Sequence, residues 1–229
     1  MTEREIFEIE NTRPHVVILG AGATIATIPN GDKNGNPCSV MHGFIHNLGL
    51  DTILATVKLN TKSENIEDIY SELYERGDEC KAVREQLEEA IFSYLSRLEL
   101  PAEITVYDEI ILALTQKDMI ATFNWDPLLI QAYNRARKLT TNLPKLTFLH
   151  GNVAAGYCER CGHFGALQRV KCDNCGAAYH RSPLLFPVKH KDYNSNPFIK
   201  QQWTILNEFL SRAKMLTIFG YSAPKTDVE

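Results

Sequence analysis

Four short apolar runs along the chain have the pattern of buried β-strands. The first, PHVVILG at 14–20, is rich in β-branched residues and enters a glycine turn. The others are DMIATFNWD at 118–126, KLTFLHG at 145–151 and AKMLTIFGYS at 213–222. Short runs that are apolar at nearly every position are typical of strands buried on both faces of a parallel sheet.

Helical periodicity fills the intervals between these strands. From Asn65 to Leu98 apolar residues recur on one face with charged residues between them, which indicates helices packed on a core. Further helices are expected at about 127–138 and 197–213, whereas NGDKNGNP at 30–37 is predicted to be a loop. Alternating strands and helices predict an α/β fold, a Rossmann-like doubly wound parallel sheet with helices on both faces.

In such sheets, ligands bind outside the carboxyl ends of the strands. This rule brings four strand endings into one predicted site: GAGAT, FNWD, LHG and GYS. Gly20 and Gly22 fit a turn in which the backbone approaches a pyrophosphate, while the following helix offers amides to the anion. The turn departs from the dehydrogenase fingerprint, because Ile25 stands at the third glycine position. We therefore expect a nucleotide-using protein other than a hydride-transferring enzyme.

Three polar side chains at the strand endings are candidates for chemistry. Asn124 and Asp126 could hold a ribose hydroxyl and an amide, and Asp126 could also cap the helix that starts at Pro127. These two roles of Asp126 are compatible. His150 carries the side chain best suited to accept a proton from a hydroxyl near neutral pH, although a single histidine is more often structural.

Composition and charge narrow the class of protein. The 229 residues, 44% apolar and 23% charged, suit one large globular domain with a small additional module. The net charge of −4 argues against direct nucleic-acid binding. The sequence has no signal peptide and no membrane-spanning run, so we expect no membrane partner and a cytoplasmic location.

Four of the six cysteines form two C-x-x-C-G knuckles separated by ten residues. They are Cys158, Cys161, Cys172 and Cys175. Four thiolates in two close pairs suit tetrahedral zinc, and the glycines allow backbone amides to turn toward the sulfurs. Because all four ligands are sulfur, the predicted zinc is structural. Cys38 and Cys80 are expected to be ordinary thiols.

The order of these motifs resembles the sirtuin family, and more closely the divergent sirtuin-like domains of prokaryotes. It runs from GAG through a Thr-x-Asn-x-Asp strand end, His-Gly and two C-x-x-C pairs to a strand ending Gly-x-Ser, over about residues 14–228. The resemblance implies an NAD-binding Rossmann domain at 1–156 and 177–229, with a zinc-binding insertion at 157–176. The resemblance further implies that Gly20, Ala21 and Gly22 contact the NAD phosphates, and that Asn124 and Asp126 contact the nicotinamide end and its ribose. It implies that His150 is the general base. Further contacts with the nucleotide are implied for Gly220 and Ser222.

The chain departs from the sirtuin pattern in two places. Where sirtuins have Gly-Ile-Pro-Asp-Phe-Arg, TIPNGDK keeps Ile28 and Pro29 but has Asn30 in place of the aspartate and no Phe-Arg. The Phe-Gly-Glu segment that binds acyl peptide is replaced by LLFPVKHKDY. Prolines 183, 187 and 197 make this region a poor template for adding a peptide strand, and Lys189, His190 and Lys191 are expected to face phosphate or solvent.

Together with the resemblance, these features predict an enzyme that hydrolyses NAD to ADP-ribose and nicotinamide. The resemblance also implies a role in prokaryotic antiphage defence. Two alternatives stay open: an NAD-dependent protein-lysine deacylase, and a non-catalytic module that senses NAD or ADP-ribose. A partner protein or an attached downstream domain is the expected trigger, and homo-oligomerisation stays open. APKTDVE at the C-terminus has the acids of a starting helix, so the chain is expected to be a fragment that lacks a further strand and helix.

Overall fold

The computed structural model describes residues 2–38, 43–167, 170–186 and 196–222. Its central element is a four-stranded sheet of order β3-β2-β1-β7, in which all neighbouring strands are parallel. The strands are β1 (His15–Leu19), β2 (Met119–Thr122), β3 (Lys145–Phe148) and β7 (Met215–Phe219). Each lies within one of the four predicted apolar runs, so the predicted parallel α/β sheet is confirmed.

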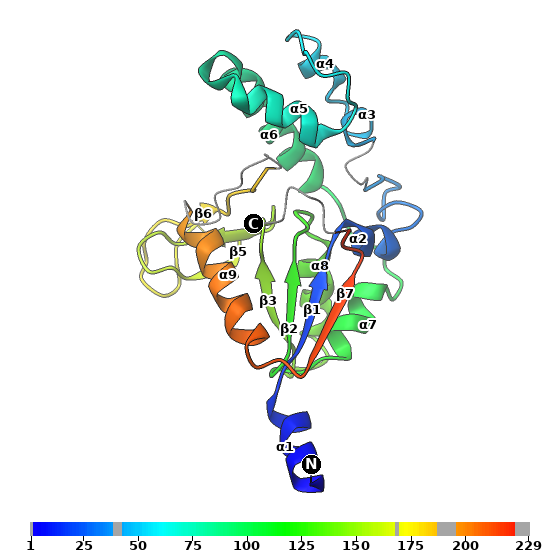
Figure 1. Ribbon diagram of the computed structural model, residues 1–229, viewed down its shortest axis with the longest axis vertical. Helices are drawn as coiled ribbons and strands as arrows, with labels where there is room; N and C mark the ends of the chain where they lie inside the picture. The colour runs from blue at the N-terminus through cyan, green and yellow to red at the C-terminus, as the bar shows by residue number, and fades with distance from the viewer. Residues whose placement is uncertain (1, 39–42, 168–169, 187–195, 223–229) are drawn as a thin grey trace.

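Helices cover both faces of this sheet (Figure 1). One face carries α9 (Pro197–Leu210), and the other carries α2 (Ala21–Thr27), α7 (Val106–Leu112) and α8 (Leu128–Ala136). Successive residues of β1 belong to different cores: Val16 lies in the cluster that contains Leu206 of α9, and Val17 lies in the cluster that contains Ala132 of α8. The inner strand β2 is buried at all four positions, which explains its nearly continuous apolar sequence, and the doubly wound arrangement is confirmed.

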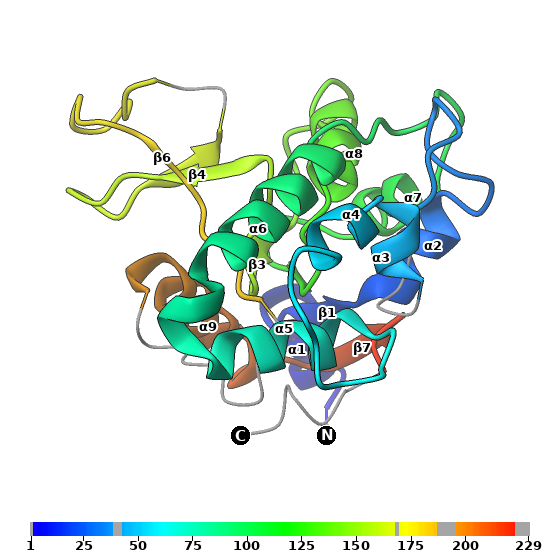
Figure 2. The ribbon, with the colours of Figure 1, turned by 90° about the horizontal axis from the view of Figure 1, so that it is seen from above.

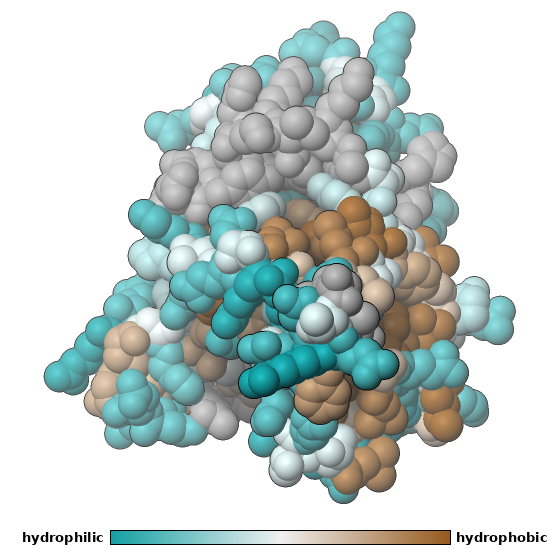
Figure 3. All heavy atoms as spheres, turned by 60° about the horizontal axis from the view of Figure 1, so that its bottom comes forward, coloured by the Kyte–Doolittle hydropathy of each residue, from teal (hydrophilic) through white to brown (hydrophobic). Residues whose placement is uncertain are grey.

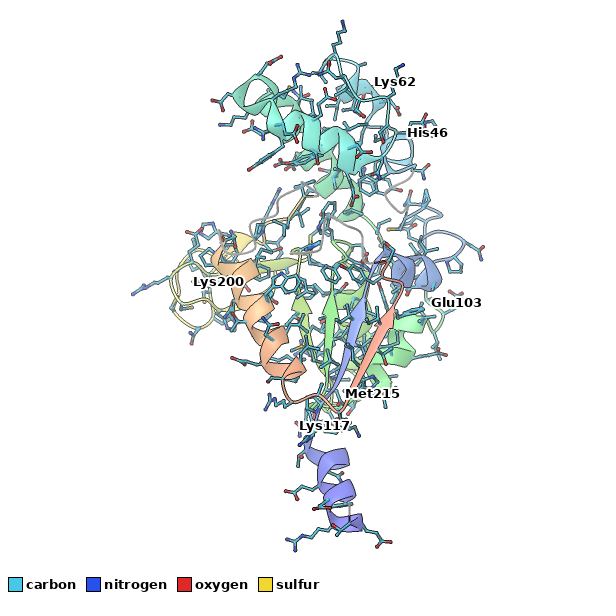
Figure 4. All side chains as sticks on the ribbon, viewed as in Figure 1. His46, Lys62, Glu103, Lys117, Lys200 and Met215 are labelled. Carbon is cyan, nitrogen blue, oxygen red and sulfur yellow. The ribbon has the colours of Figure 1, made fainter. Side chains whose placement is uncertain are left out.

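A helical region, residues 43–98, stands over the carboxyl end of the sheet (Figures 1 and 2). It contains α3 (Phe44–Asn47), α4 (Asp51–Leu54), α5 (Ile66–Glu75), a 3-10 turn (Gly77–Cys80) and α6 (Lys81–Leu95). His46 and Lys62 of this region lie at the opposite end of the sheet from Lys117 and Met215 (Figure 4). The helical region therefore adjoins the edge at which the candidate residues were predicted.

Several helices were not predicted from the sequence. Three of them, α3, α4 and α7, have only four to seven residues, too few to display a periodic apolar face. The fourth, α1 (Glu3–Thr12), extends away from the amino end of the sheet (Figure 1). None of the helices in the described part of the chain has the length and apolar character needed to span a membrane.

A second, antiparallel sheet of order β5-β4-β6 lies beside β3 and α9 (Figure 1). Its strands are β4 (Ala155–Tyr157), β5 (Phe164–Ala166) and β6 (His180–Arg181), and the four clustered cysteines lie between them. Arg181 reaches the helical region, with its guanidinium 3.1 Å from Glu89 and 4.2 Å from the ring centre of Phe92. The small sheet and the helical region thus contact each other at the carboxyl end of the large sheet.

The strand β7 forms one edge of the large sheet in the described part of the chain. Met215, Leu216 and Ile218 are about half exposed, at 52%, 49% and 57%. Hydrophobic side chains gather on this side of the molecule in Figure 3.

At the amino end of the sheet, Asp118 fastens the start of β1 to the start of β2. Its buried carboxylate accepts hydrogen bonds from the amides of His15 and Thr115, both at 2.8 Å, and from the Thr115 hydroxyl at 2.9 Å. Burial by itself raises the pKa of Asp118, but these hydrogen bonds outweigh it and hold the pKa below its usual value.

We expect Asp118→Asn to lower the free energy of unfolding by about 1–3 kcal/mol near neutral pH, because buried donors lose a charged acceptor. Since the folded-state pKa is lowered, the contribution of the carboxylate is complete above its unfolded pKa of about 4 and disappears as the pH falls through the folded value. The difference between wild type and variant should therefore shrink in acid. Urea titrations near neutral pH and at about pH 3 measure it; a difference independent of pH would contradict the assignment.

Candidate active site and metal centre

Four turns meet at the carboxyl end of the parallel sheet. They follow β3, β2, β1 and β7, and they carry His150, Asn124, Gly20 to Gly22, and Gly220. The Asn124 side chain donates to the Gly20 carbonyl at 2.8 Å, and the Gly22 amide donates to the Gly220 carbonyl at 2.8 Å. The Phe123 ring lies 4.8 Å from the His150 ring and 4.4 Å from the Tyr221 ring, centre to centre. These contacts bring together the four endings that the sequence places in one site.

Asn124 is held by a buried polar cluster. Its Nδ2 donates to Thr24 Oγ1 at 2.8 Å and lies 3.2 Å from the Tyr107 hydroxyl. Thr24 donates in turn to Asp126 Oδ2 at 2.7 Å. The side chain of Asn124 is partly exposed, and its carboxamide oxygen has no hydrogen-bond partner among the described residues. This oxygen is therefore the atom that Asn124 can offer to a ligand hydroxyl.

The Asp126 carboxyl group points into the protein and is only 5% exposed. Its Oδ1 accepts the Leu128 amide at 3.1 Å. The helix α8 begins at Leu128 with Pro127 as its cap residue, one position later than predicted, so Asp126 binds the first helical amide from outside the cap position. Burial raises the pKa of Asp126. Both carboxyl oxygens are engaged inside the protein, and contact of Asp126 with the nicotinamide end stays a prediction.

Gly20 and Gly22 are required by the packing of the chain itself. A Cβ at Gly20 would lie 2.5 Å from the Cα of Tyr221, and one at Gly22 would lie 2.8 Å from the Cα of Gly220. Because the Gly22 amide already donates to Gly220, it does not serve a phosphate in this conformation. Ala21 is half-buried and Ser222 is exposed, and their contacts with a nucleotide stay predictions.

His150 is buried and meets Phe123 edge to face, with an interplanar angle of 72°. Its backbone carbonyl accepts the Leu185 amide at 2.8 Å. Gly151 follows with φ +82°, and a Cβ there would lie 1.7 Å from the Pro183 carbonyl oxygen. The segment that returns from β6 therefore packs directly on the His-Gly turn. Residues 187–195, including Pro187, Lys189, His190 and Lys191, lie outside the described residues.

Sequence reasoning missed Thr24, Tyr107, Trp125 and Asn152 as parts of this site. Trp125 is 8% exposed, and its indole N–H is buried without a partner among the described residues. A donor that is buried without a partner destabilises the folded protein by about 1–3 kcal/mol. A ligand oxygen that accepted this hydrogen bond would remove that cost. Thr24 ends the GAGAT motif and could have been included on that basis. No local signal identifies Tyr107, because only the packing of α7 brings its hydroxyl to Thr24.

The four predicted zinc ligands form one cluster. The Cys158 and Cys175 sulfurs are 3.5 Å apart, as are those of Cys161 and Cys172, and all four lie within 4.8 Å of one another. Zinc bonded to four tetrahedral sulfurs at about 2.3 Å separates the sulfurs by about 3.8 Å, which this cluster fits. The four thiolates leave no ligand position for water, so the ion they would hold is structural.

The two knuckles repeat one backbone pattern. In each, the glycine amide donates to the carbonyl of the first cysteine, at 2.9 and 2.8 Å. Gly162 and Gly176 both have positive φ, +67° and +72°, which permits this turn. Hydrogen bonds, chiefly from the His163 amide, lower the pKa of Cys161 to about 6, which favours the thiolate, the form that binds zinc. A hydrogen bond from the Ala177 amide lowers the pKa of Cys175, but burial and the neighbouring sulfurs outweigh it and raise the pKa to about 12.

No family model and no curated protein matches the chain. Similar solved structures are Sir2 proteins. Two of them are "Sir2 bound to acetylated peptide", with a TM-score of 0.43, and "Sir2-p53 peptide-NAD+", with a TM-score of 0.42; both are 20% identical in sequence. A third, "Structure of Sir2Tm bound to a propionylated peptide", has a TM-score of 0.35 and is 18% identical. Each match covers 99% of this chain and 80% of the other chain. The chain is thus similar to Sir2 structures over nearly its whole length at low identity, while its fold class rests on the strand order and cysteine cluster above.

Purified protein should contain one zinc ion per chain. Cys172→Ser should release it and destabilise the small sheet, because structural zinc contributes about 10 kcal/mol or more to folding comparable small modules. Elemental analysis combined with thiol titration measures the loss. Cys38→Ser, outside the cluster, is the control and should retain the metal. A zinc-free native protein with four freely titrating thiols would refute the metal site.

Proposed function

We propose that this protein cleaves the nicotinamide–ribose bond of NAD and transfers the ribose to water. The observation that carries the proposal is that the four strand-ending turns meet: the amide nitrogen of Asn124 is held by Gly20 and Thr24, and the His150 ring contacts Phe123, the residue before Asn124. The position outside the carboxyl ends of a doubly wound sheet is the usual nucleotide position of this architecture.

The reaction balances without a further reagent. The C–N bond between ribose and nicotinamide breaks, and its electron pair remains with nicotinamide, which leaves as the neutral amide. A water oxygen forms the new bond to the same ribose carbon and loses one proton. The products are ADP-ribose, nicotinamide and a proton. A site that stabilises the positive charge developing on the ribose accelerates this step.

The residues present fit this substrate class. The free carboxamide oxygen of Asn124 can accept a ribose hydroxyl, which orients the sugar and stabilises charge developing on it. His150 is the candidate proton acceptor at the ribose hydroxyls or at water. The buried indole N–H of Trp125, which has no partner among the described residues, is the donor proposed for a carboxamide oxygen of the substrate. The aromatic rings of Phe123 and Tyr221 stack on each other at this end of the sheet, with centres 4.4 Å apart.

The packing of Ser182–Phe186 supports water as the acceptor in preference to an acyl-lysine peptide. The amides of Ser182 and Leu185 pair with the carbonyls of Ala155 and His150, so this edge of the His-Gly segment is occupied by the chain itself. Pro183, within the segment, lacks an amide for adding a further strand. Activation by a partner protein, an attached domain or oligomerisation is part of the proposal.

We expect His150→Ala and Asn124→Ala each to reduce nicotinamide release about 10²–10⁴-fold while the protein stays folded, because each removes a group positioned at the ribose. Chromatographic assay of nicotinamide measures the rate, and circular dichroism verifies the fold. His46→Ala is the matched control, because this histidine lies in the helical region with its side chain 89% exposed. A reduction below fivefold at His150 would assign this residue a structural role.

The acceptor is tested by incubating the protein with NAD, with and without an acetyl-lysine peptide. We expect ADP-ribose and nicotinamide at the same rate in both samples, because water is the acceptor. Product that forms only with peptide, as O-acetyl-ADP-ribose, would establish the deacylase instead. NAD binding without any product, under conditions in which a candidate activator is present, would favour the sensing module.

A further inference from the structure

Asn152 joins the two turns that carry the proposed catalytic residues. The side chain is buried, with 1% exposed. Its Nδ2 donates to the backbone carbonyl of Asp126 at 2.6 Å and to that of Asn124 at 3.4 Å, and its Oδ1 accepts the Ala154 amide at 2.9 Å. Because Asn152 comes two residues after His150, one side chain connects the His150 turn with the Asn124 turn.

Ser182 holds Asn152 by two backbone hydrogen bonds. The Asn152 amide donates to Ser182 Oγ at 2.9 Å, and Ser182 Oγ donates to the Asn152 carbonyl at 2.8 Å. The Ser182 amide donates to the Ala155 carbonyl at 2.9 Å. Ser182 directly follows β6 and is 3% exposed. The pair is therefore anchored in the small sheet that carries the cysteine cluster.

We propose that Asn152 is a positioning residue and that Ser182 fixes it, so that the small sheet sets the placement of Asn124 relative to His150. This inference rests on the proposed function. Loss of the Asn152 amide would release two backbone carbonyls of the Asn124 turn. A displacement of about 1 Å in a reacting group reduces a rate by about 10²-fold, even when the altered residue does not touch the substrate.

Two variants test the Asn152–Ser182 pair, one at each residue. Asn152→Asp keeps the shape of the side chain and removes its N–H donors, and Ser182→Ala removes the hydroxyl. We expect each to lower kcat for nicotinamide release about 10- to 100-fold and to change the KM for NAD less than about threefold, because orientation is lost rather than substrate contact. Ser182→Thr keeps the hydroxyl and should restore most of kcat.

Asn65→Ala is the matched control for stability. Its side chain caps α5 by accepting the Glu67 amide, away from the strand-ending turns. The variant should lose thermal stability, as Ser182→Ala does, and retain wild-type kcat. Equal losses of kcat in these two variants at a matched melting temperature would overturn the inference, because stability alone would then explain the effect.

Amide hydrogen exchange provides a readout that needs no turnover. Leu128 and Val153 donate their amides to Asp126 Oδ1 and to the Trp125 carbonyl, within the turns that Asn152 joins. Both amides should exchange about tenfold faster in Ser182→Ala than in wild type. Unchanged exchange at both positions would overturn the positioning role. Faster exchange in a protein whose wild type releases no nicotinamide would support the positioning pair and reject the proposed function alone.

Discussion

The carboxyl group of Asp126 lies inside the protein, and it must find hydrogen-bond donors there. Thr24 and the Leu128 amide supply them, which fixes α2 and the start of α8 against the end of β2. Because the Thr24 hydroxyl donates its proton to Asp126, it can only accept from Tyr107 and Asn124. One buried carboxyl group thus orients a chain of polar groups that ends at Asn124. Satisfying this group inside the protein gives the proposed site a fixed edge.

Aromatic packing connects that edge to the helical region. Phe186 stacks on Tyr70 of α5 with ring centres 4.9 Å apart, and it lies 5.0 Å from Trp125. Phe186 belongs to the segment that returns from the small sheet, so three parts of the fold meet at its ring. Contacts between aromatic rings stabilise such a junction by apolar packing and need no polar partners. The helical region and the small sheet are therefore both coupled to the turn that follows β2.

Glycine-rich turns have two possible physical origins, and the structure of this site shows one of them. A nucleotide phosphate requires close approach of the backbone, and so does a neighbouring backbone segment. At Gly22 the neighbour is Gly220, whose own φ is +66°. The motif GAG therefore predicts the turn correctly, while the identity of the group that approaches it depends on the strand that arrives about 200 residues later. This dependence on a distant segment limits what a local motif can specify.

The sequence alone determined the elements whose causes are local. Apolar runs specified β1, β2, β3 and β7, and the spacing of the cysteines specified their cluster, because side-chain period and knuckle geometry act over a few residues. Only the tertiary structure decided which buried polar groups support the site. Tyr107 and Ser182 contact Thr24 and Asn152 across 83 and 30 residues, and no short-range pattern encodes such pairs. Burial makes each of these groups seek a partner, and the packing of the helices and sheets determines which partner is within reach.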